Sequence, residues 1–271
     1  VGKESYNLTG YFNMPKVLEL ALNDGVDPRT GRRIGPSTGD PATFGSFQEM
    51  FEAYRRQLMA LMDIKVRGNQ VIERLYAEHL PVPFLSLLID DCVATGKDYH
   101  DGGARYNTTY VQGVGLGTMA DALTAIKVHV FERQTLTMAD LMAALRDDFR
   151  GPARIRQLLL NRGPRYGNDD DAADDVMRAV FEAYFEAVDG RPNTRGATIT
   201  STSCPPPATS TLARCAGRPP TGAWQARRFP RASLPFRAPT GAGPRPCCAP
   251  RPRWTTSGPA VRSSTRNSAR N

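Results

Sequence analysis

Within residues 1–196, the side chains best suited to chemistry are one cysteine, three histidines and a run of aspartates. Cys92 directly follows Asp90 and Asp91. A thiol reacts or binds metal as its thiolate, and neighbouring negative charges oppose that form by raising the pKa of the thiol. Cys92 is therefore predicted to be a structural thiol.

The aspartate run NDDDAADD, over residues 168–175, resembles a cation-binding loop. It lacks the alternate ligand positions and the glycine of an EF-hand. Aspartates also cap helices and favour the first helical turn, which explains the run without a metal. His79, His100 and His129 have no partner at metal-ligand spacing, so no metal ligand is predicted.

Two glycine-rich segments adjoin a polar stretch. GVGLG (113–117) lacks the G-x-G-x-x-G spacing and the acidic ribose ligand of a dinucleotide-binding loop. It therefore predicts a tight turn where the backbone comes close to another group. Just upstream, two adjacent glycines precede Arg105, Tyr106 and Asn107, which stand where an apolar strand enters a core.

The elements that position these residues are mainly helices. Ser46 with Glu49 and Thr137 with Asp140 have capping-box spacing, and Thr118 is a candidate cap. Apolar periodicity predicts helices over 13–25, 46–80 (one helix or two), 118–131, 137–149 and 168–190.

Strand signals are few. Residues 106–117 alternate and are β-branched, which predicts a strand ending in glycines, while 81–92 could be a strand or the start of a helix. The fold class is α/β and helix-rich. With so few strands, residues 1–196 are expected to be part of a larger domain.

Charge divides the chain sharply at residue 196. Residues 197–271 hold 12 of the 35 basic residues, all arginine, and no acidic residue; this leaves 23 basic and 27 acidic residues before them. The tail also holds four of the five cysteines and both tryptophans. No apolar run in 1–196 approaches the roughly 18–20 residues of a membrane span, so a cytoplasmic location is expected.

Four segments together resemble the glycyl radical enzymes, the pyruvate formate-lyase-like superfamily. These are GKESYNLTGYFNMPKVLELALNDGVDPRTG (2–31), PFLSLLIDDCVATGKDYHDGGARYN (83–107), GVGLGTMADALTAIK (113–127) and PRYGNDDDAADD (164–175). Their order and spacing agree with the family over essentially all of 1–196. The resemblance implies a ten-stranded α/β barrel of two half-barrels, of which this chain would be one part.

The resemblance also implies the chemistry. A glycine near the C-terminus stores a radical, a central cysteine becomes a thiyl, and in eliminating branches a glutamate two residues later acts as base. An activating enzyme using S-adenosylmethionine and an iron–sulfur cluster installs the radical. The full-length enzyme needs no bound cofactor, acts on a small molecule and is expected to be a homodimer.

None of these three groups occurs in this chain. The family's Cys-x-Glu loop lies just upstream of the segment that matches GKESY, so we expect it immediately before Val1. No catalytic residue is assigned, and the chain alone is expected to be inactive. Because the rest of the barrel is missing from the sequence, strand edges and apolar faces are expected to be exposed.

GKESYNLTGYFN (2–13) is most similar to the branch that dehydrates trans-4-hydroxy-L-proline. Diol dehydratases, choline-type lyases and formate C-acetyltransferases are the alternatives. By carry-over, Tyr11 and Asn13 could face the substrate, with Tyr11 binding a carboxylate or hydroxyl, or both could simply begin a buried helix. Tyr106 and Asn107 could line the barrel entrance.

The tail (197–271) has two interpretations. Read one base earlier, its codons permit GGHYHINLLPTTCHVY from Gly196, which resembles the family; the tail is then out-of-frame translation and is expected to be disordered. Alternatively, it is a basic nucleic-acid-binding segment, in which Trp224 and Trp254 stack on single strands. A steep salt dependence in a gel shift would favour the second interpretation.

Overall fold

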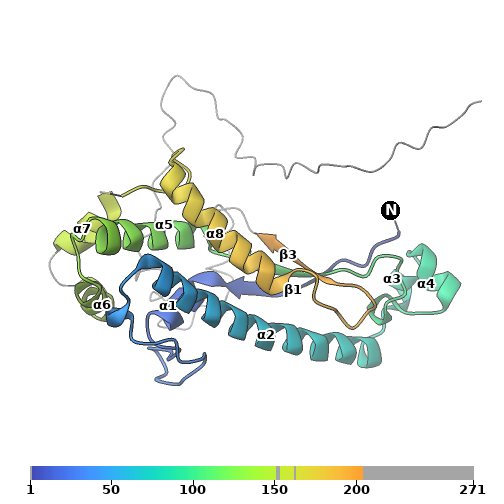
Figure 1. Cartoon of the computed structure of the whole chain (residues 1–271). Helices are drawn as coiled ribbons and strands as arrows, with labels where there is room; N and C mark the ends of the chain where they lie inside the picture. The colour runs from blue at the N-terminus through green and yellow to red at the C-terminus, as the bar shows by residue number, and fades with distance from the viewer. Residues whose placement is uncertain (1, 151–152, 162, 204–271) are drawn as a thin grey trace, which may run out of the picture. The chain divides into compact units, whose positions relative to one another are not determined.

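The described residues contain a small parallel sheet (Figure 1). Strands β1 (Asn7–Asn13), β2 (Thr109–Val114) and β3 (Ile199–Ser203) pair in that order. The computed structural model describes residues 2–150, 153–161 and 163–203. The sequence places 197–203 in the tail, but β3 brings them into the sheet, because Ile199 is buried and β-branched residues favour strands. The rest of the predicted tail lies outside the described residues.

Helices make up most of the rest. Short 3-10 turns occupy Pro41–Thr43 and Tyr99–Asp101, and a π-helical turn, η3, occupies Lys127–Glu132. The α-helices are α1 (Met14–Ala21), α2 (Phe47–His79), α3 (Pro83–Ser86), α4 (Asp90–Thr95), α5 (Leu116–Ile126), α6 (Met138–Arg146), α7 (Ala153–Asn161) and α8 (Asp171–Val188).

Capping residues mark several helix starts as predicted. Residues 46–80 form the single helix α2, whose Ser46 side chain accepts from the amide of Glu49. Thr137 accepts from the amide of Asp140 at the start of α6. Asp170 accepts from the amide of Ala172, so the aspartate run does cap a helix, α8.

Other boundaries differ from those predicted. Thr118 is not a cap, because α5 begins earlier, after Gly115 in the left-handed region, and gives way to η3 after Ile126. Residues 81–92 contain the short helix α3 and the start of α4 rather than a strand. Helix α7 and strand β1 were not predicted from the sequence.

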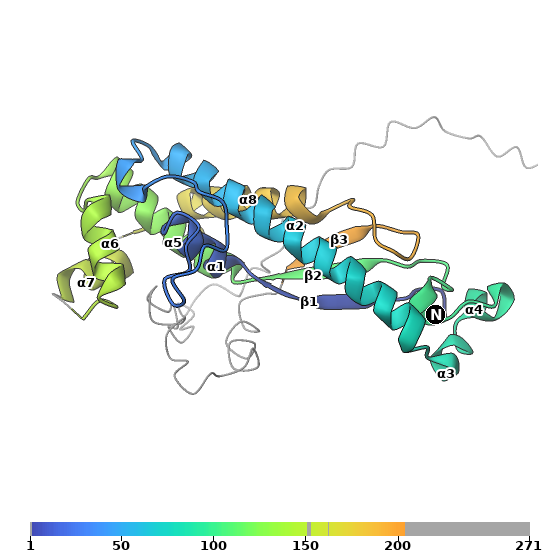
Figure 2. The same cartoon turned by 90° about the horizontal axis from the view of Figure 1, so that it is seen from below.

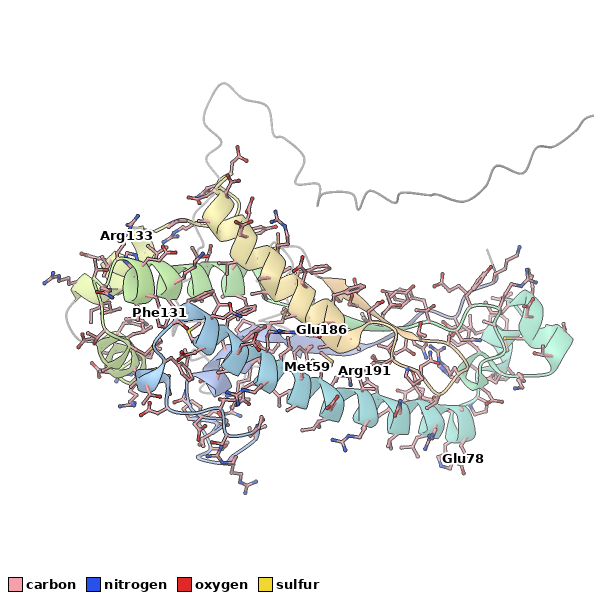
Figure 3. The ribbon with its side chains drawn as sticks, viewed as in Figure 1. Met59, Glu78, Phe131, Arg133, Glu186 and Arg191 are labelled. Atoms are coloured by element: carbon pink, nitrogen blue, oxygen red, sulfur yellow. The ribbon has the colours of Figure 1, made fainter. Side chains whose placement is uncertain are left out.

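Helices α2 and α8 lie on the same side of the sheet (Figures 1 and 2). Beneath them, Phe12 of β1 stacks with Tyr184 of α8, whose ring centroids are 6.4 Å apart. Two ion pairs link α2 to α8 and to the segment after it: Arg55 donates to Glu186 at 2.6 Å, and Arg191 donates to Asp63 at 2.5 Å. Glu186 and Arg191 are labelled in Figure 3. The main core contains Met14, Leu18, Leu58, Val111, Leu123, Val180 and Tyr184.

The glycines of GVGLG allow close packing, as predicted. A Cβ on Gly113 would lie 3.0 Å from the Tyr184 ring, and one on Gly115 would lie 2.6 Å from Pro15. The Tyr184 hydroxyl donates to the carbonyl of Val111 at 2.7 Å. These contacts let α1 and α8 pack directly against the end of β2.

A buried polar network lies at the N-terminal ends of β1 and β2. The side chains of Glu73 and Arg195 are 3% and 1% exposed, and Arg195 Nε lies 3.9 Å from Glu73 Oε1. Arg195 also donates to Ser5 Oγ and to the carbonyl of Thr108, while Glu73 accepts from the amide and hydroxyl of Thr194. Opposite charges are therefore buried together with hydrogen-bond partners, as burial of charge requires.

We predict that Arg195→Met destabilises the chain by about 3–5 kcal/mol, because it leaves the carboxylate of Glu73 buried without its cation. Urea unfolding of the full chain, followed by circular dichroism, measures the change. Arg74→Met, on the exposed face of the same helix α2, is the control and is expected to stay within about 0.5 kcal/mol. A loss below about 1 kcal/mol for Arg195→Met would contradict the prediction.

Candidate functional site

The sheet has one face covered by α2 and α8 and one that the described helices leave uncovered, here called the open face. Side chains alternate between the faces along each strand. Thr109 and Val111 of β2 are buried on the covered face, whereas Tyr110 and Gln112 are half-buried. Strand pairing of Tyr110 with Leu8 and of Gln112 with Tyr11 extends the alternation to β1. The open face carries Tyr6, Leu8, Tyr11, Asn13, Tyr110 and Gln112.

Tyr11 and Tyr106, two of the predicted site residues, are exposed. The Tyr11 side chain is on the open face and 51% exposed, and Tyr106 is 59% exposed just before β2, bridged to Glu4. Asn13 ends β1, is exposed, and its side chain accepts from the amide of Lys16, which caps α1. Tyr11 therefore belongs to a strand and not to the helix that follows.

Asn107 has a different position. Its side chain is buried, and its amide nitrogen donates to the carbonyls of Gly102 and Ala104. Asn107 thus shapes the loop that leads into β2 instead of facing the open face, because it lies two residues before the buried Thr109. Arg105 forms a two-pronged ion pair with Asp91, at 2.8 and 3.0 Å, and is therefore a structural residue of this loop.

An aromatic stack on the open face was missed from the sequence. Tyr6 and Tyr110 stack with ring centroids 4.4 Å apart, and the Tyr110 hydroxyl donates to Glu4 at 3.2 Å. Burial first, and then the hydrogen bond to Glu4, raise the pKa of Tyr110. The alternation of Tyr110 and Gln112 with buried neighbours is the signal that could have identified this face.

The other candidate groups are structural. Cys92 is 3% exposed, and the pKa of its thiol is raised, as predicted, but chiefly by burial, with Asp98 and Asp91 adding to it and no contribution from Asp90. His100 lies edge-on between the rings of Tyr76 and Tyr99. His129 is buried in η3 with Nδ1 3.1 Å from the hydroxyl of Thr135.

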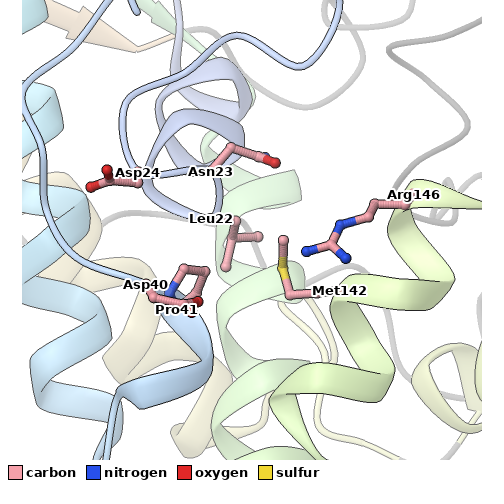
Figure 4. Close-up of a pocket in the computed structure, with 7 residues that line it drawn as sticks. All are labelled: Leu22, Asn23, Asp24, Asp40, Pro41, Met142 and Arg146. Carbon is pink, nitrogen blue, oxygen red and sulfur yellow. The ribbon is translucent and has the colours of Figure 1, made fainter. Parts of the chain in front are cut away.

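A separate hollow of about 230 Å³ lies at the end of α1 (Figure 4). Leu22 and Met142 form its apolar part, and the Arg146 side chain points toward them. Asp24 at its rim already accepts from the amides of Thr38 and Gly39 and from Ser37, and these hydrogen bonds lower the pKa of its carboxyl. None of the predicted site residues lies in this hollow.

Comparison with known proteins identifies the family. The model of the pyruvate formate lyase-like family matches residues 1–209. This chain belongs to that family. The chain spans about a quarter of the length of the curated relatives it matches, so it corresponds to one part of a glycyl radical enzyme.

Two of the relatives that the chain resembles are dehydratases. The chain is 52% identical over 195 residues to trans-4-hydroxy-L-proline dehydratase of Clostridioides difficile, covering 72% of this chain and 25% of that protein. It is 36% identical over 197 residues to (2S)-3-sulfopropanediol dehydratase of Klebsiella oxytoca, covering 72% and 24%.

Solved structures of the family superpose on the chain. The hydroxyproline dehydratase of C. difficile, crystallised with trans-4-hydroxy-L-proline, matches with a TM-score of 0.75 and 48% identity over 82% of this chain and 28% of that one. The B12-independent glycerol dehydratase of Clostridium butyricum matches with a TM-score of 0.69 and 33% identity over 74% and 25%. The fold is therefore a partial glycyl radical enzyme fold.

The open face of this pyruvate formate lyase-like chain offers hydrogen bonding but no strong acid–base or metal chemistry. Phenols and amides can bind carboxylates and hydroxyls. No group of His, Cys, Asp and Glu in the described ranges has the arrangement of a metal site. None of the described helices is both long and apolar enough to span a bilayer.

We predict that the phenol of Tyr110 titrates above its ordinary pKa of about 10. Glu4→Gln removes the negative charge and is expected to lower that midpoint, while burial keeps it above 10. ¹³C-tyrosine NMR, with the signal assigned through Tyr110→Phe, measures both midpoints. Glu78→Gln, an exposed charge at the far end of α2, should leave the Tyr110 midpoint in place; an unchanged midpoint in Glu4→Gln would refute the prediction.

Proposed function

We propose that this chain is part of a radical dehydratase that acts on trans-4-hydroxy-L-proline in the cytoplasm. The identity of 52% to the dehydratase of that amino acid, against 36% to the sulfopropanediol enzyme, is the observation that carries the proposal. Residues that line a binding site change with the substrate, so the higher identity favours the same substrate. A diol dehydratase, a choline-type lyase or a formate C-acetyltransferase is the alternative.

The reaction in the whole enzyme needs groups beyond this sequence. Family members abstract a hydrogen atom with a cysteine thiyl, and those of the eliminating branches use a glutamate two residues later as base. None of the five cysteines here is followed two residues later by glutamate. We therefore propose that the chain alone is inactive, and that the complete homodimeric enzyme receives its glycyl radical from an S-adenosylmethionine-dependent activating enzyme.

The chain's own contribution is to bind and orient the substrate. Tyr11 stands on the open face with its phenol available for a carboxylate or hydroxyl, and Asn13 follows it at the end of the same strand. Tyr106 stands on the loop before β2. In this proposal it lines the entrance of the barrel. The buried Asn107 does not contact the substrate in this proposal. It supports the loop that carries Tyr106.

We further propose that the sequence leaves its reading frame close to Gly196. Support comes from the abrupt change of composition: arginine without lysine, aspartate or glutamate from residue 197 on. Two features run past Gly196, the short β3 and the family match to residue 209; β3 is compatible with a shift because Ile and Thr favour strands by themselves.

The substrate is tested in a chimera that carries residues 1–196 in place of the matching segment of the C. difficile enzyme. After anaerobic activation, we expect the chimera to consume trans-4-hydroxy-L-proline with kcat/KM within about tenfold of the parent, because the open face is retained. Tyr11→Phe should lower kcat/KM about tenfold or more, as loss of a hydrogen bond to a charged group does. Tyr76→Phe, an exposed tyrosine on α2, is the matched control.

A chimera that carries the glycyl radical after activation but consumes glycerol or another diol in place of trans-4-hydroxy-L-proline would refute the substrate assignment. Electron paramagnetic resonance on the same samples detects the glycyl radical and separates failed activation from changed specificity. The full 271-residue chain, treated in parallel, is expected to show neither radical nor turnover.

Resequencing the gene across the codon for Gly196 tests the frame. We expect one inserted or missing base, after which the translation continues with histidine-containing, family-like sequence and regains acidic residues. A confirmed frame through the arginine-rich codons would instead favour a nucleic-acid-binding tail, which a salt-dependent gel shift then checks.

A further inference from the structure

Strand β1 contains a bulge that decides which of its side chains reach the open face. Leu8 pairs with Tyr110 and Tyr11 pairs with Gln112, so Thr9 and Gly10 together oppose the single residue Val111. Bulges are rare in parallel pairs and often re-aim a side chain beside a functional site. Gly10 has φ of 111°, a conformation that favours glycine.

The extra residue changes the alternation of β1. With it, Tyr11 is 51% exposed on the open face, and Phe12 is 8% exposed against Tyr184 on the covered face. Without it, Tyr11 would lie on the covered face, where Phe12 lies now, because a one-residue slip moves every later side chain to the other face. A phenol hydroxyl would then enter the apolar core, and the open face would receive a phenylalanine.

Helix α2 holds this bulge through two polar side chains. Lys65 Nζ donates to the carbonyl of Thr9 at 2.8 Å, and Asn69 Nδ2 donates to Thr9 Oγ1 at 2.7 Å. Thr9 Oγ1 in turn donates to the carbonyl of Tyr110 at 3.1 Å. A bulge removes backbone groups from the strand ladder, and these side chains supply the missing partners.

Burying these donors is costly, which shows that the contacts are specific. Asn69 is 2% exposed, and burial lowers the pKa of Lys65. A lysine at this helix position could otherwise extend to water at little cost. Instead it reaches the bulge, where a Cβ on Gly10 would lie 3.4 Å from Nζ.

We propose that Lys65 and Asn69 are positioning residues that act through the Thr9–Gly10 bulge to present Tyr11 to the substrate. The inference rests on the proposed function for its enzymatic part, whereas the geometric part stands on the contacts alone. The partner of Tyr11 in the substrate is a carboxylate or a hydroxyl, the groups that a phenol recognises.

The geometric part is tested on the monomeric fraction of the full chain by hydroxyl-radical footprinting with mass spectrometry. In the native chain, Tyr11 should be modified and Phe12 protected. Lys65→Met should lower the Tyr11-to-Phe12 modification ratio at least about threefold, because the bulge loses its charged donor. Arg74→Met is the control; an unchanged ratio in Lys65→Met overturns the proposal.

Thr9→Val provides a second variant in case Lys65→Met fails to fold. It keeps the side-chain shape and removes the hydroxyl that links Asn69 to Tyr110, so the same fall in the ratio is expected. Lys65→Arg, which keeps a cationic donor, should restore the native ratio. A native Tyr11-to-Phe12 ratio in Thr9→Val would by itself overturn the proposal, without any assay of activity.

The enzymatic part is tested in the chimera by a double-mutant cycle. Lys65→Met should raise KM about tenfold with little change in kcat, since it removes binding shared by ground and transition states. In a Tyr11→Phe background the same substitution should have almost no further effect. Additive losses overturn the proposal, whereas a chimera without turnover of trans-4-hydroxy-L-proline contradicts only the proposed substrate and leaves the footprinting result standing.

Discussion

The buried pairing of Arg195 with Glu73 is the constraint on which the arrangement of the sheet depends. A guanidinium keeps its proton in proteins, so burying it demands a nearby carboxylate and filled hydrogen-bond positions. Arg195 obtains the carboxylate from α2 and hydrogen-bond acceptors for Nη1 and Nη2 from Ser5 before β1 and from the start of β2, while its buried Nε lies 3.9 Å from the carboxylate without a hydrogen bond. Segments nearly 200 residues apart in sequence are thereby brought to one point. The three strands begin beside this point and pair in a fixed register. That register sets which side chains lie next to each other on the open face.

The fold was only partly predictable from the sequence, because local hydrogen bonds leave a sequence signal that strand pairing does not. Caps such as Ser46 and Thr137 act locally, through hydrogen bonds within one helical turn, and were confirmed. Strand β1 has no comparable local signal, because the bulge breaks the period-2 alternation between Leu8 and Tyr11. The start of α5 was misplaced for a related reason: Gly115 ends β2 in a left-handed conformation, and the helix begins without a side-chain cap.

The candidate site shows a similar division. Tyr11 was predicted through resemblance and is exposed on the open face, yet nothing in the local pattern shows that it belongs to a strand. The stack of Tyr6 on Tyr110 joins residues 104 positions apart and depends on strand pairing, which no local pattern contains. Asn107 could be judged only from its hydrogen bonds, because an asparagine before a strand suits a binding site and a loop equally well.

A sheet that must bury one face and leave the other uncovered has little freedom in its register. The covered face of β1 accepts Phe12 because Tyr184 lies opposite, and the open face accepts Tyr11 because its phenol stays half exposed there. Tyr11 and Phe12 are adjacent, and the bulge before them places Tyr11 on the open face and Phe12 on the covered face. Since Lys65 and Asn69 lie on α2, the helix that also carries Glu73, one rigid element controls both the anchoring of the sheet and the aim of its side chains.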